Sequence, residues 1–414
     1  MQESHAQPAS VATRERPWLF ALLIAPTAII DVGLVTGALS FLLRREGIDP
    51  ARGSEIVALL TIPHTIYFLW CPVSDFWMRR RTWILISSAA AAAILLLAFH
   101  QPSLGSAWAI RFIFISYCLG LLVAASCGGI MGTFQSDVNR RRASSAYQSG
   151  SLFFSAITVF VLVALADRLP LSGLGWVASA MIVAPALAAF LLPPEAAPVH
   201  QNFRAAFARI RSEFRSTFRQ WNALPYLLLI TFPMGSGAMI GLLPGLAADF
   251  GVSGAQVAWM NGVAGALLTT LGTLAAAFIP VRLRAPLAFP LAGMVNACAL
   301  AILALAPLRP AIYFAGSALY LFTIGCCWAL FTGVALDFLG GSGKTGGARY
   351  AIINSIGNLP VAYMTYLDGR GYAYWGPRGM PAVDAVLSAS GATLLLLLFL
   401  VRGVPRRIKI EASD

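Results

Sequence analysis

The chain has 414 residues, of which 58% are hydrophobic and only 11% are charged, and its formal net charge is +12. Soluble domains carry about 25% charged residues, so this composition excludes an ordinary soluble protein and leaves little chain for a soluble domain. The positive charge does not indicate a nucleic-acid-binding protein, because no basic cluster lies on a segment that could fold as a soluble binding domain.

Long apolar stretches separate almost all of the charged clusters. A helix needs roughly 20 apolar residues to cross a bilayer, and uninterrupted runs such as 83–99 and 224–240 exclude the alternating pattern of a β-barrel. We therefore predict an all-α membrane protein with twelve transmembrane helices arranged as two six-helix bundles. In chain order the predicted spans are 18–43, 55–74, 82–99, 107–133, 146–166, 173–192, 224–247, 256–279, 286–306, 311–336, 351–367 and 383–401.

The longest polar interval divides these spans into six and six. We predict an N-terminal bundle over 1–192, a linker over 193–223, and a C-terminal bundle with a short basic tail over 224–414. Apolar residues recur in the linker at helical spacing and arginines take its other faces. This pattern is typical of an amphipathic helix on the inner surface of a membrane.

The distribution of basic residues predicts the orientation. With the N-terminus in the cytoplasm, 21 of the 29 lysines and arginines fall on the cytoplasmic side, as the positive-inside rule requires. Both termini are then cytoplasmic, which needs an even number of spans. The first 16 residues are polar and the first apolar run is too long for a signal core, so we expect no cleavable signal.

Asp31 lies near the middle of the first predicted span, and His64 and Tyr67 lie in the second. A lone carboxylate at that depth costs about 2.5–3.5 kcal/mol, so Asp31 should face a cavity or find a partner. We predict that Asp31 binds solute and carries protons, and that His64, which titrates near neutral pH, shares in proton coupling. Tyr67, one turn after His64, is a candidate solute contact. The alternative for Asp31 and His64 is a hydrogen bond that only packs helices together.

The loop after the second span reads P-V-S-D-F-W-M-R-R-R over 72–81. It resembles a degenerate form of the G-x-x-x-D-R-x-G-R-R loop of the major facilitator superfamily: the carboxylate and the arginines match and the glycines do not. The resemblance implies a gate formed by Asp75 with Arg79, Arg80 and Arg81. The alternative is that the arginines only set the topology.

Two segments narrow the resemblance. Residues 68–75, F-L-W-C-P-V-S-D, are similar to the F-L-W-[SA]-P-x-x-D end of the second span in AmpG-like permeases, and 348–360 are similar to the A-T-Q-Y-A-L-L-S-S-x-x-N-L-P opening of their eleventh span. That branch imports anhydro-muropeptides, and its shorter relatives import iron siderophores. The stop after twelve spans, and Arg349 in place of a neutral polar residue, favour the RhtX/FptX-type siderophore permeases.

Other polar and aromatic residues at membrane depth are candidates for solute binding, with helix packing as the alternative for each. Asn354 and Asn358 place two amides on one helical face, and Trp328 offers a stacking surface. The further candidates are Gln148, Asn261 and Tyr363. Asp337 is the expected second-half counterpart of Asp75, a gating residue that could pair with Lys344 or Arg349.

No cofactor or metal site is expected. The segment 340–346 resembles a phosphate-binding loop, but Phe338 stands where its first glycine is required. The four histidines lie far apart, which excludes metal-ligand spacing. We expect the six cysteines to be buried fillers. A membrane enzyme would need a cluster of acid, His or Ser residues at one interface, and the sequence shows none, so we do not expect an enzyme.

The sequence thus predicts a secondary active transporter of the bacterial inner membrane. It would import an iron siderophore, a pyochelin- or rhizobactin-type chelate, with protons. The alternative is an AmpG-like permease that imports anhydro-muropeptides for cell-wall recycling and β-lactamase induction, and export within the same fold stays open. The expected partners are the small-molecule solute and membrane lipid, with no nucleic acid, and the expected state is a monomer.

Overall fold

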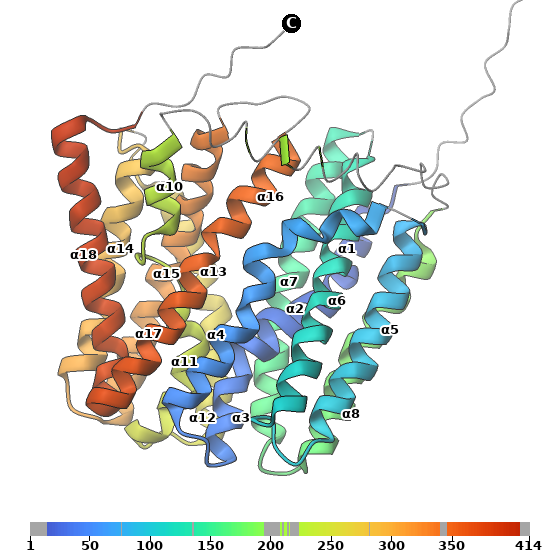
Figure 1. The fold of residues 1–414 in the computed structure, drawn as a ribbon, viewed down its shortest axis with the longest axis horizontal. Helices are drawn as coiled ribbons and strands as arrows, with labels where there is room; N and C mark the ends of the chain where they lie inside the picture. Colours follow the sequence, from blue (N-terminus) through green and yellow to red (C-terminus); the bar gives the residue numbers. More distant parts are fainter. Residues whose placement is uncertain are drawn as a thin grey trace, which may run out of the picture.

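The computed structural model describes residues 15–75, 77–134, 136–193, 223–280, 282–339 and 346–405, together with 208, 211, 212 and 215. Within these ranges every regular element is a helix, which confirms the all-α prediction. Long helices run side by side, alternating in direction (Figure 1). We call the end at which α18 finishes, at the top of Figure 1, the terminal end, and the end at which α18 begins the opposite end.

The first half of the chain begins with a continuous but irregular span from Pro17 to Arg45. Its elements are η1 (Pro17–Leu19), α1 (Phe20–Leu23), α2 (Ala25–Ala28), η2 (Ile29–Ala38) and α3 (Leu39–Arg45). The elements that follow are α4 (Pro50–Ile66), η3 (Tyr67–Leu69), η4 (Cys71–Asp75), α5 (Arg80–Phe99), α6 (Ala107–Gly132), α7 (Asp137–Leu165), α8 (Leu171–Ala186) and η5 (Leu187–Leu191).

The second half is interrupted more often. Its elements are α10 (Ala223–Thr231), α11 (Ala238–Leu246), η6 (Ala247–Phe250), α12 (Gly254–Val257), η7 (Ala258–Ala264), α13 (Gly265–Ala275), η8 (Ala276–Phe278), α14 (Ala285–Leu305), α15 (Pro310–Leu339), α16 (Gly346–Gly357), α17 (Leu359–Trp375), η9 (Gly376–Arg378) and α18 (Gly379–Arg402). The predicted linker helix falls almost entirely outside the described residues.

Nine stretches of the described chain are long and apolar enough to cross a membrane, so the protein is a multi-pass membrane protein. One of them, Ile352–Arg402, runs for 51 residues. The count of twelve spans stays a prediction. The helix boundaries that differ most from the predicted ones are those of α7, which begins at Asp137 instead of 146, and α17, which continues to Trp375 instead of 367. Helical hydrogen bonding continues there past the point at which the sequence stops being apolar.

The predicted span 224–247 is not one continuous helix. Six residues, Phe232 to Gly237, separate α10 from α11 and are called the α10–α11 break below. Pro233 lacks the N–H that a continuing helix would use. Gly235 and Gly237 have φ of 61° and 82°, a left-handed conformation that glycine adopts without steric cost.

Two segments of π-helix widen other spans. η2 covers ten residues and includes Asp31, and η7 covers seven and includes Asn261. Such wide turns are rare and are often found at functional sites. In η2 the consequence is local: the Asp31 carbonyl accepts a bond from the Thr36 hydroxyl at 3.1 Å, five residues along.

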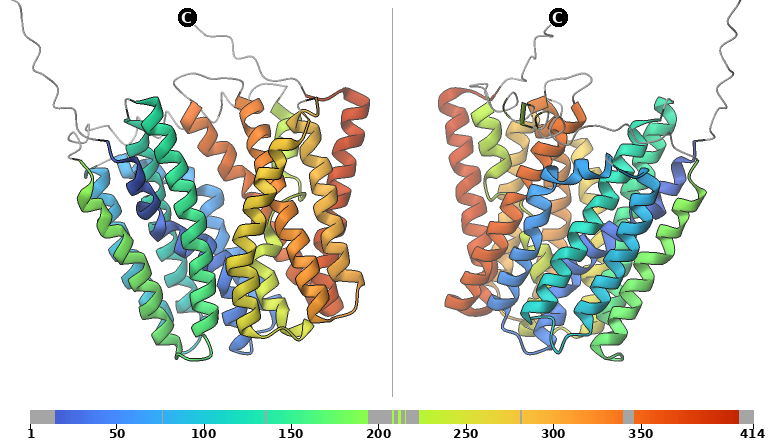
Figure 2. Two further views of the ribbon diagram at one scale, coloured as in Figure 1. Left: turned by 180° about the vertical axis from the view of Figure 1, so that it is seen from behind. Right: turned by 45° about the vertical axis from the view of Figure 1, so that its right-hand side comes forward.

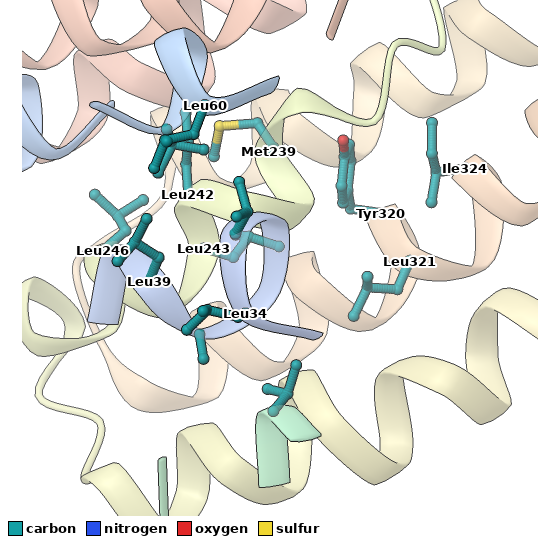
Figure 3. Close-up of a cluster of buried hydrophobic side chains, with 14 of the residues drawn as sticks. Leu34, Leu39, Leu60, Met239, Leu242, Leu243, Leu246, Tyr320, Leu321 and Ile324 are labelled. Atoms are coloured by element: carbon teal, nitrogen blue, oxygen red, sulfur yellow. The ribbon is translucent and has the colours of Figure 1, made fainter. Parts of the chain in front are cut away.

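The two halves are in contact through a buried layer of leucines. α11 packs its side chains among those of η2, α3 and α4 (Figure 3). We call this the leucine layer, and its members are Leu34, Leu39, Leu60, Met239, Leu242, Leu243 and Leu246, each at most 2% exposed. A Cβ at Gly241 would lie 3.0 Å from the Thr36 carbonyl oxygen, so the two backbones are nearly touching. The helices of the two halves are closest at the opposite end and diverge towards the terminal end (Figures 1 and 2).

The crossing of α13 and α15 should not tolerate a side chain at Gly272. An added Cβ there would overlap the Phe322 carbonyl. The Gly272 carbonyl itself accepts a hydrogen bond from the Cys326 thiol. Overpacking costs about 1–3 kcal/mol, so Gly272→Ala should lower the thermal unfolding midpoint of the detergent-purified protein. Gly128→Ala is the matched control because nothing lies within 4 Å of its Cβ position. Equal midpoints for both variants would contradict this packing.

Candidate proton and solute site

A carboxylate, an imidazole and a phenol meet in the first half of the chain. The Tyr117 hydroxyl on α6 donates to Oδ1 of Asp31 on η2. Nδ1 of His64 on α4 lies 3.3 Å from Oδ2 of Asp31 and 3.2 Å from the Tyr117 hydroxyl. We call these three residues the Asp31 triad. It joins three helices through groups that would each be costly to leave unpaired in the apolar interior.

The short contact between Nδ1 of His64 and Asp31 needs a hydrogen on one of the two groups. A neutral imidazole supplies it as the tautomer with hydrogen on Nδ1, which donates to the carboxylate or to the phenol oxygen. The site takes up a further proton when the other ring nitrogen or the carboxyl group is protonated as well, and this needs little movement of the side chains.

Packing of α6 against the first span brings Tyr117 to Asp31. The Thr27 hydroxyl donates to the Gly120 carbonyl at 2.6 Å, and a Cβ at Gly120 would lie 3.2 Å from the Ile30 side chain. Asp31 is halfway along the 29-residue stretch Pro17–Arg45. The triad is therefore held deep in the bundle, on the side of the leucine layer that faces the terminal end.

The structure brings three of the residues predicted for this site together. Asp31 and His64 are in contact, and the ring of Tyr67 meets the His64 ring edge-on with centroids 5.9 Å apart. Sequence reasoning missed Tyr117. A lone tyrosine in an apolar span usually packs, and nothing in the sequence marks it as the residue that reaches Asp31.

Two predicted residues lie elsewhere. Gln148 is exposed on α7. The Asn261 amide donates to the Tyr313 hydroxyl at 2.7 Å and to the Val257 carbonyl at 3.3 Å. Tyr313 in turn donates to the Leu243 carbonyl at 3.1 Å. Asn261 thus links η7 to α15 through hydrogen bonds, as expected for the helix-packing alternative to solute binding.

Two further predicted residues lie next to the α10–α11 break. The Tyr363 hydroxyl on α17 donates to the Thr231 carbonyl, the last of α10, at 2.7 Å. The Trp328 ring on α15 lies beside Gly237, 3.1 Å from the position of an added Cβ, and is 38% exposed. The amides Asn354 and Asn358 are both half-buried, and Asn358 donates to the Asn354 carbonyl at 2.8 Å within the same helical segment.

The predicted gating residues are only partly described. Arg80 donates to the Gly129 carbonyl at 2.9 Å and Arg81 to the Leu192 carbonyl at 3.5 Å. Both arginines thus bind carbonyls near the ends of neighbouring helices in their own half, while Arg79 is exposed. The Asp75 side chain lies outside the described residues.

Asp337, the gating residue predicted in the second half, has a basic neighbour that the sequence did not indicate. Asp337 lies 3.9 Å from Arg284, at the start of α14. The predicted partners are not described: Lys344 lies outside the described residues, and so does the side chain of Arg349. Arg284 reaches Asp337 because α14 begins beside the end of α15, a proximity that sequence separation hides.

A polar network that sequence reasoning missed joins the two halves at the opposite end. Arg44 on α3 pairs with Asp249 on η6 at 3.0 Å, and the Tyr372 hydroxyl on α17 donates to the other oxygen of Asp249 at 3.1 Å. We call this the Arg44–Asp249–Tyr372 network. All three residues fall just beyond the ends of predicted spans, where we expected loops.

The chain matches no family model, and no curated protein matches its sequence. Solved structures with the same fold exist at low identity. The nucleoside transporter NupG is 13% identical with a TM-score of 0.72, covering 92% of this chain and 98% of that one. A D-xylose-proton symporter is 15% identical with a TM-score of 0.67, covering 95% and 98%.

A third structure, a POT family transporter in complex with a thioalcohol-conjugated peptide, is 10% identical with a TM-score of 0.66, covering 93% of this chain and 96% of that one. Sequence identities this low show that the fold is shared and nothing more. The chain therefore has the fold of major facilitator-type transporters over nearly its whole length.

Proposed function

We propose that this protein is a proton-coupled secondary transporter that carries an organic solute across the bacterial inner membrane. The observation that carries the proposal is the Asp31 triad, a buried site halfway along a span in which a carboxylate meets an imidazole that can gain and release a proton. A structural hydrogen bond alone would not need three ionisable groups on three helices, since an amide or hydroxyl pair would pack as well at lower cost.

The exposure of the triad supports exchange of its proton. The His64 side chain is 27% exposed and that of Asp31 is 10% exposed, so the proton enters and leaves through the imidazole. A histidine titrates within the physiological range, which suits a group that must load and release a proton in each cycle.

The solute site of this proposal lies between the halves, next to interrupted spans. Broken helices in transporters offer free backbone groups to solutes and coupling ions. Trp328 and Tyr363 flank the α10–α11 break, and Tyr67 lies beside the triad in the other half. Aromatic surfaces and few charges suit a small aromatic iron chelate better than a sugar-peptide.

The substrate assignment rests on the resemblance of 68–75 and 348–360 to the AmpG-like branch. We assign the siderophore as substrate, and an anhydro-muropeptide as the second candidate. In the same proposal the bundles are 1–192 and 224–414, joined by the linker 193–223, with both termini cytoplasmic. The opposite end, closed by the leucine layer and the Arg44–Asp249–Tyr372 network, is then the outer end, and this conformation faces the cytoplasm.

Transport by the purified protein in liposomes tests the proposal. With an imposed inward proton gradient, we expect ferric pyochelin to accumulate above its external concentration, and a protonophore to abolish that accumulation. An anhydro-muropeptide offered under the same conditions should not accumulate. Gradient-driven uptake of the muropeptide alone would favour the second candidate. Uptake of either solute at a rate independent of the proton gradient would refute proton coupling.

A further inference from the structure

Two aspartates are buried in the second half of the chain, away from the Asp31 triad. Asp368 on α17 is 0% exposed and Asp384 on α18 is 2% exposed. The Ser388 hydroxyl lies 2.7 Å from Oδ1 of Asp384. Among the described residues, both oxygens of Asp368 and Oδ2 of Asp384 have no hydrogen-bond partner.

A buried phenol completes the cluster independently. Tyr320 on α15 is 1% exposed, and its hydroxyl lies near the Met239 backbone without a well-formed hydrogen bond to any described residue. It interacts electrostatically with both carboxyl groups, so three helices each supply an oxygen-bearing side chain to one dry region. Buried polar groups in proteins are nearly always paired, and a proton on one of the two carboxyl groups would give this region a donor that it otherwise lacks.

No cation neutralises the two carboxyl groups in the described part of the chain. The charged group that acts on Asp368 is Asp384, and Asp384 also acts on a second phenol, Tyr363. The two helices are in close contact here, since a Cβ at Gly371, one turn after Asp368, would lie 2.7 Å from the side chain of Val383, the residue before Asp384. Two ionised carboxylates at such an apolar contact repel each other and lose their hydration, which costs several kcal/mol or more. At least one of them must therefore carry a proton.

The ionisable groups on the neighbouring helices are engaged elsewhere or exposed. One turn along α17, Tyr372 binds Asp249, which pairs with Arg44. On α4, Arg52 and Glu55 pair with each other at 2.6 Å. Other ionisable side chains on the packed helices are also engaged or exposed: His64 belongs to the Asp31 triad, Arg370 donates to the Tyr374 hydroxyl, Tyr226 stacks on Phe338, and Arg378, Arg402 and Cys298 are exposed. Cys327 on α15 is buried and acts on Tyr320.

We propose that Asp368 and Asp384 form a second proton-binding site, whose state is transmitted to the α10–α11 break through Ser388. The single hydroxyl proton of Ser388 has two acceptors within reach, Asp384 at 2.7 Å and the Pro233 carbonyl at 3.3 Å. When Asp384 is ionised, Ser388 donates to it. When Asp384 is protonated, its own O–H donates to Ser388, and Ser388 is free to donate to Pro233.

Protonation therefore moves one hydrogen bond from the carboxyl group to the backbone of the break. The proton comes from water and returns to it, and no other bond changes. The Tyr363 hydroxyl donates to the Thr231 carbonyl just before the break, so the break is tied to α17 and α18 next to the two aspartates. The role of this site in coupling rests on the proposed transport function. The binding of a proton by the two aspartates does not.

Infrared titration of the full-length protein in nanodiscs tests the site without transport. We expect the carbonyl stretch of a protonated carboxyl group to rise as the pH falls in the wild type, and to be lost in Asp368→Asn and in Asp384→Asn. Asparagine keeps the shape of the protonated acid, so both variants should fold. Asp167→Asn is the control, because that carboxylate is 71% exposed and lies in the other half.

Proton counting on the same variants tests the coupling. Asp368→Asn or Asp384→Asn should remove about one proton per transported solute while leaving the Asp31-dependent proton in place. A carboxyl band that stays at full height at every pH, or one that responds to Na⁺ and not to pH, would overturn the second site. If the wild type moves no protons but the titrating band is present, the transport proposal fails and the site stands.

Discussion

Asp31→Asn is expected to abolish uphill accumulation of the solute while leaving solute exchange partly intact. The asparagine keeps the shape of the side chain and its bond from Tyr117, but it cannot accept the proton that His64 shares with the carboxylate. Exchange needs only the binding of solute at both faces, whereas accumulation needs a proton to be carried with it. Uptake and counterflow in liposomes with an imposed proton gradient measure the two separately.

Substitutions of the other two members of the triad test how much each of them contributes to uphill accumulation. His64→Gln should lose accumulation as Asp31→Asn does, because the proton has no route through the imidazole. Tyr117→Phe should lose less, since it removes one hydrogen bond to a carboxylate, about 1.5–3 kcal/mol, and no titrating group. His100→Gln is the matched control: that ring stacks edge-on against Trp176 at the opposite end, far from the triad. Uphill accumulation that persists in Asp31→Asn would refute the assignment of Asp31 as a proton carrier.

Breaking the Arg44–Asp249–Tyr372 network should open the opposite end. Arg44→Gln removes a charge-assisted bond between partly buried groups, whose side chains are 32% and 14% exposed. Such a bond contributes about 1.5–3 kcal/mol, and that energy corresponds to a tenfold to hundredfold shift in the balance of two conformations. Amide hydrogen exchange should therefore quicken at the opposite end, in the turns that follow α3 and η6.

Two comparisons show whether the effect belongs to the contact between the halves. Arg45→Gln is the control, because Arg45 pairs with Asp167 within the first half at 3.1 Å and both groups are more exposed. Reversing the charges, Arg44→Asp with Asp249→Arg, should restore slow exchange. Equal exchange in Arg44→Gln and Arg45→Gln would show that the network does not hold the halves together.

The fold could be predicted from the sequence because the sequence features that indicate it are local. Each apolar run of membrane length predicts a helix by itself, and the helical character of every described span is confirmed. The errors lie where neighbouring packing overrides hydropathy. α17 continues through Asp368 and Arg370 because Gly369 lets it pack against Ser54 and Ala51 of α4, and nothing in residues 368–375 announces that contact.

The site could be predicted only in part for the same reason. Asp31 and His64 stand out because charge and imidazole are rare in apolar spans. Tyr117 and Tyr320 do not stand out, since a buried phenol is ordinary until its neighbours are known. Asp384 was assigned to a span but not singled out, and Asp368 fell just beyond one, so the cluster that they form depends on a helix–helix contact that spacing along the chain cannot show.

The location of the two proton sites constrains how energy is passed between them. Every member of the Asp31 triad lies before Gly132, the end of α6, and every member of the Asp368–Asp384 cluster lies after Pro310, the start of α15. A tilt of one half against the other as a rigid body therefore leaves each cluster's internal bonds unchanged. What such a tilt alters is the solvent that each cluster meets, and because hydration stabilises a charged group, each cluster would change its proton affinity as it gains or loses contact with water.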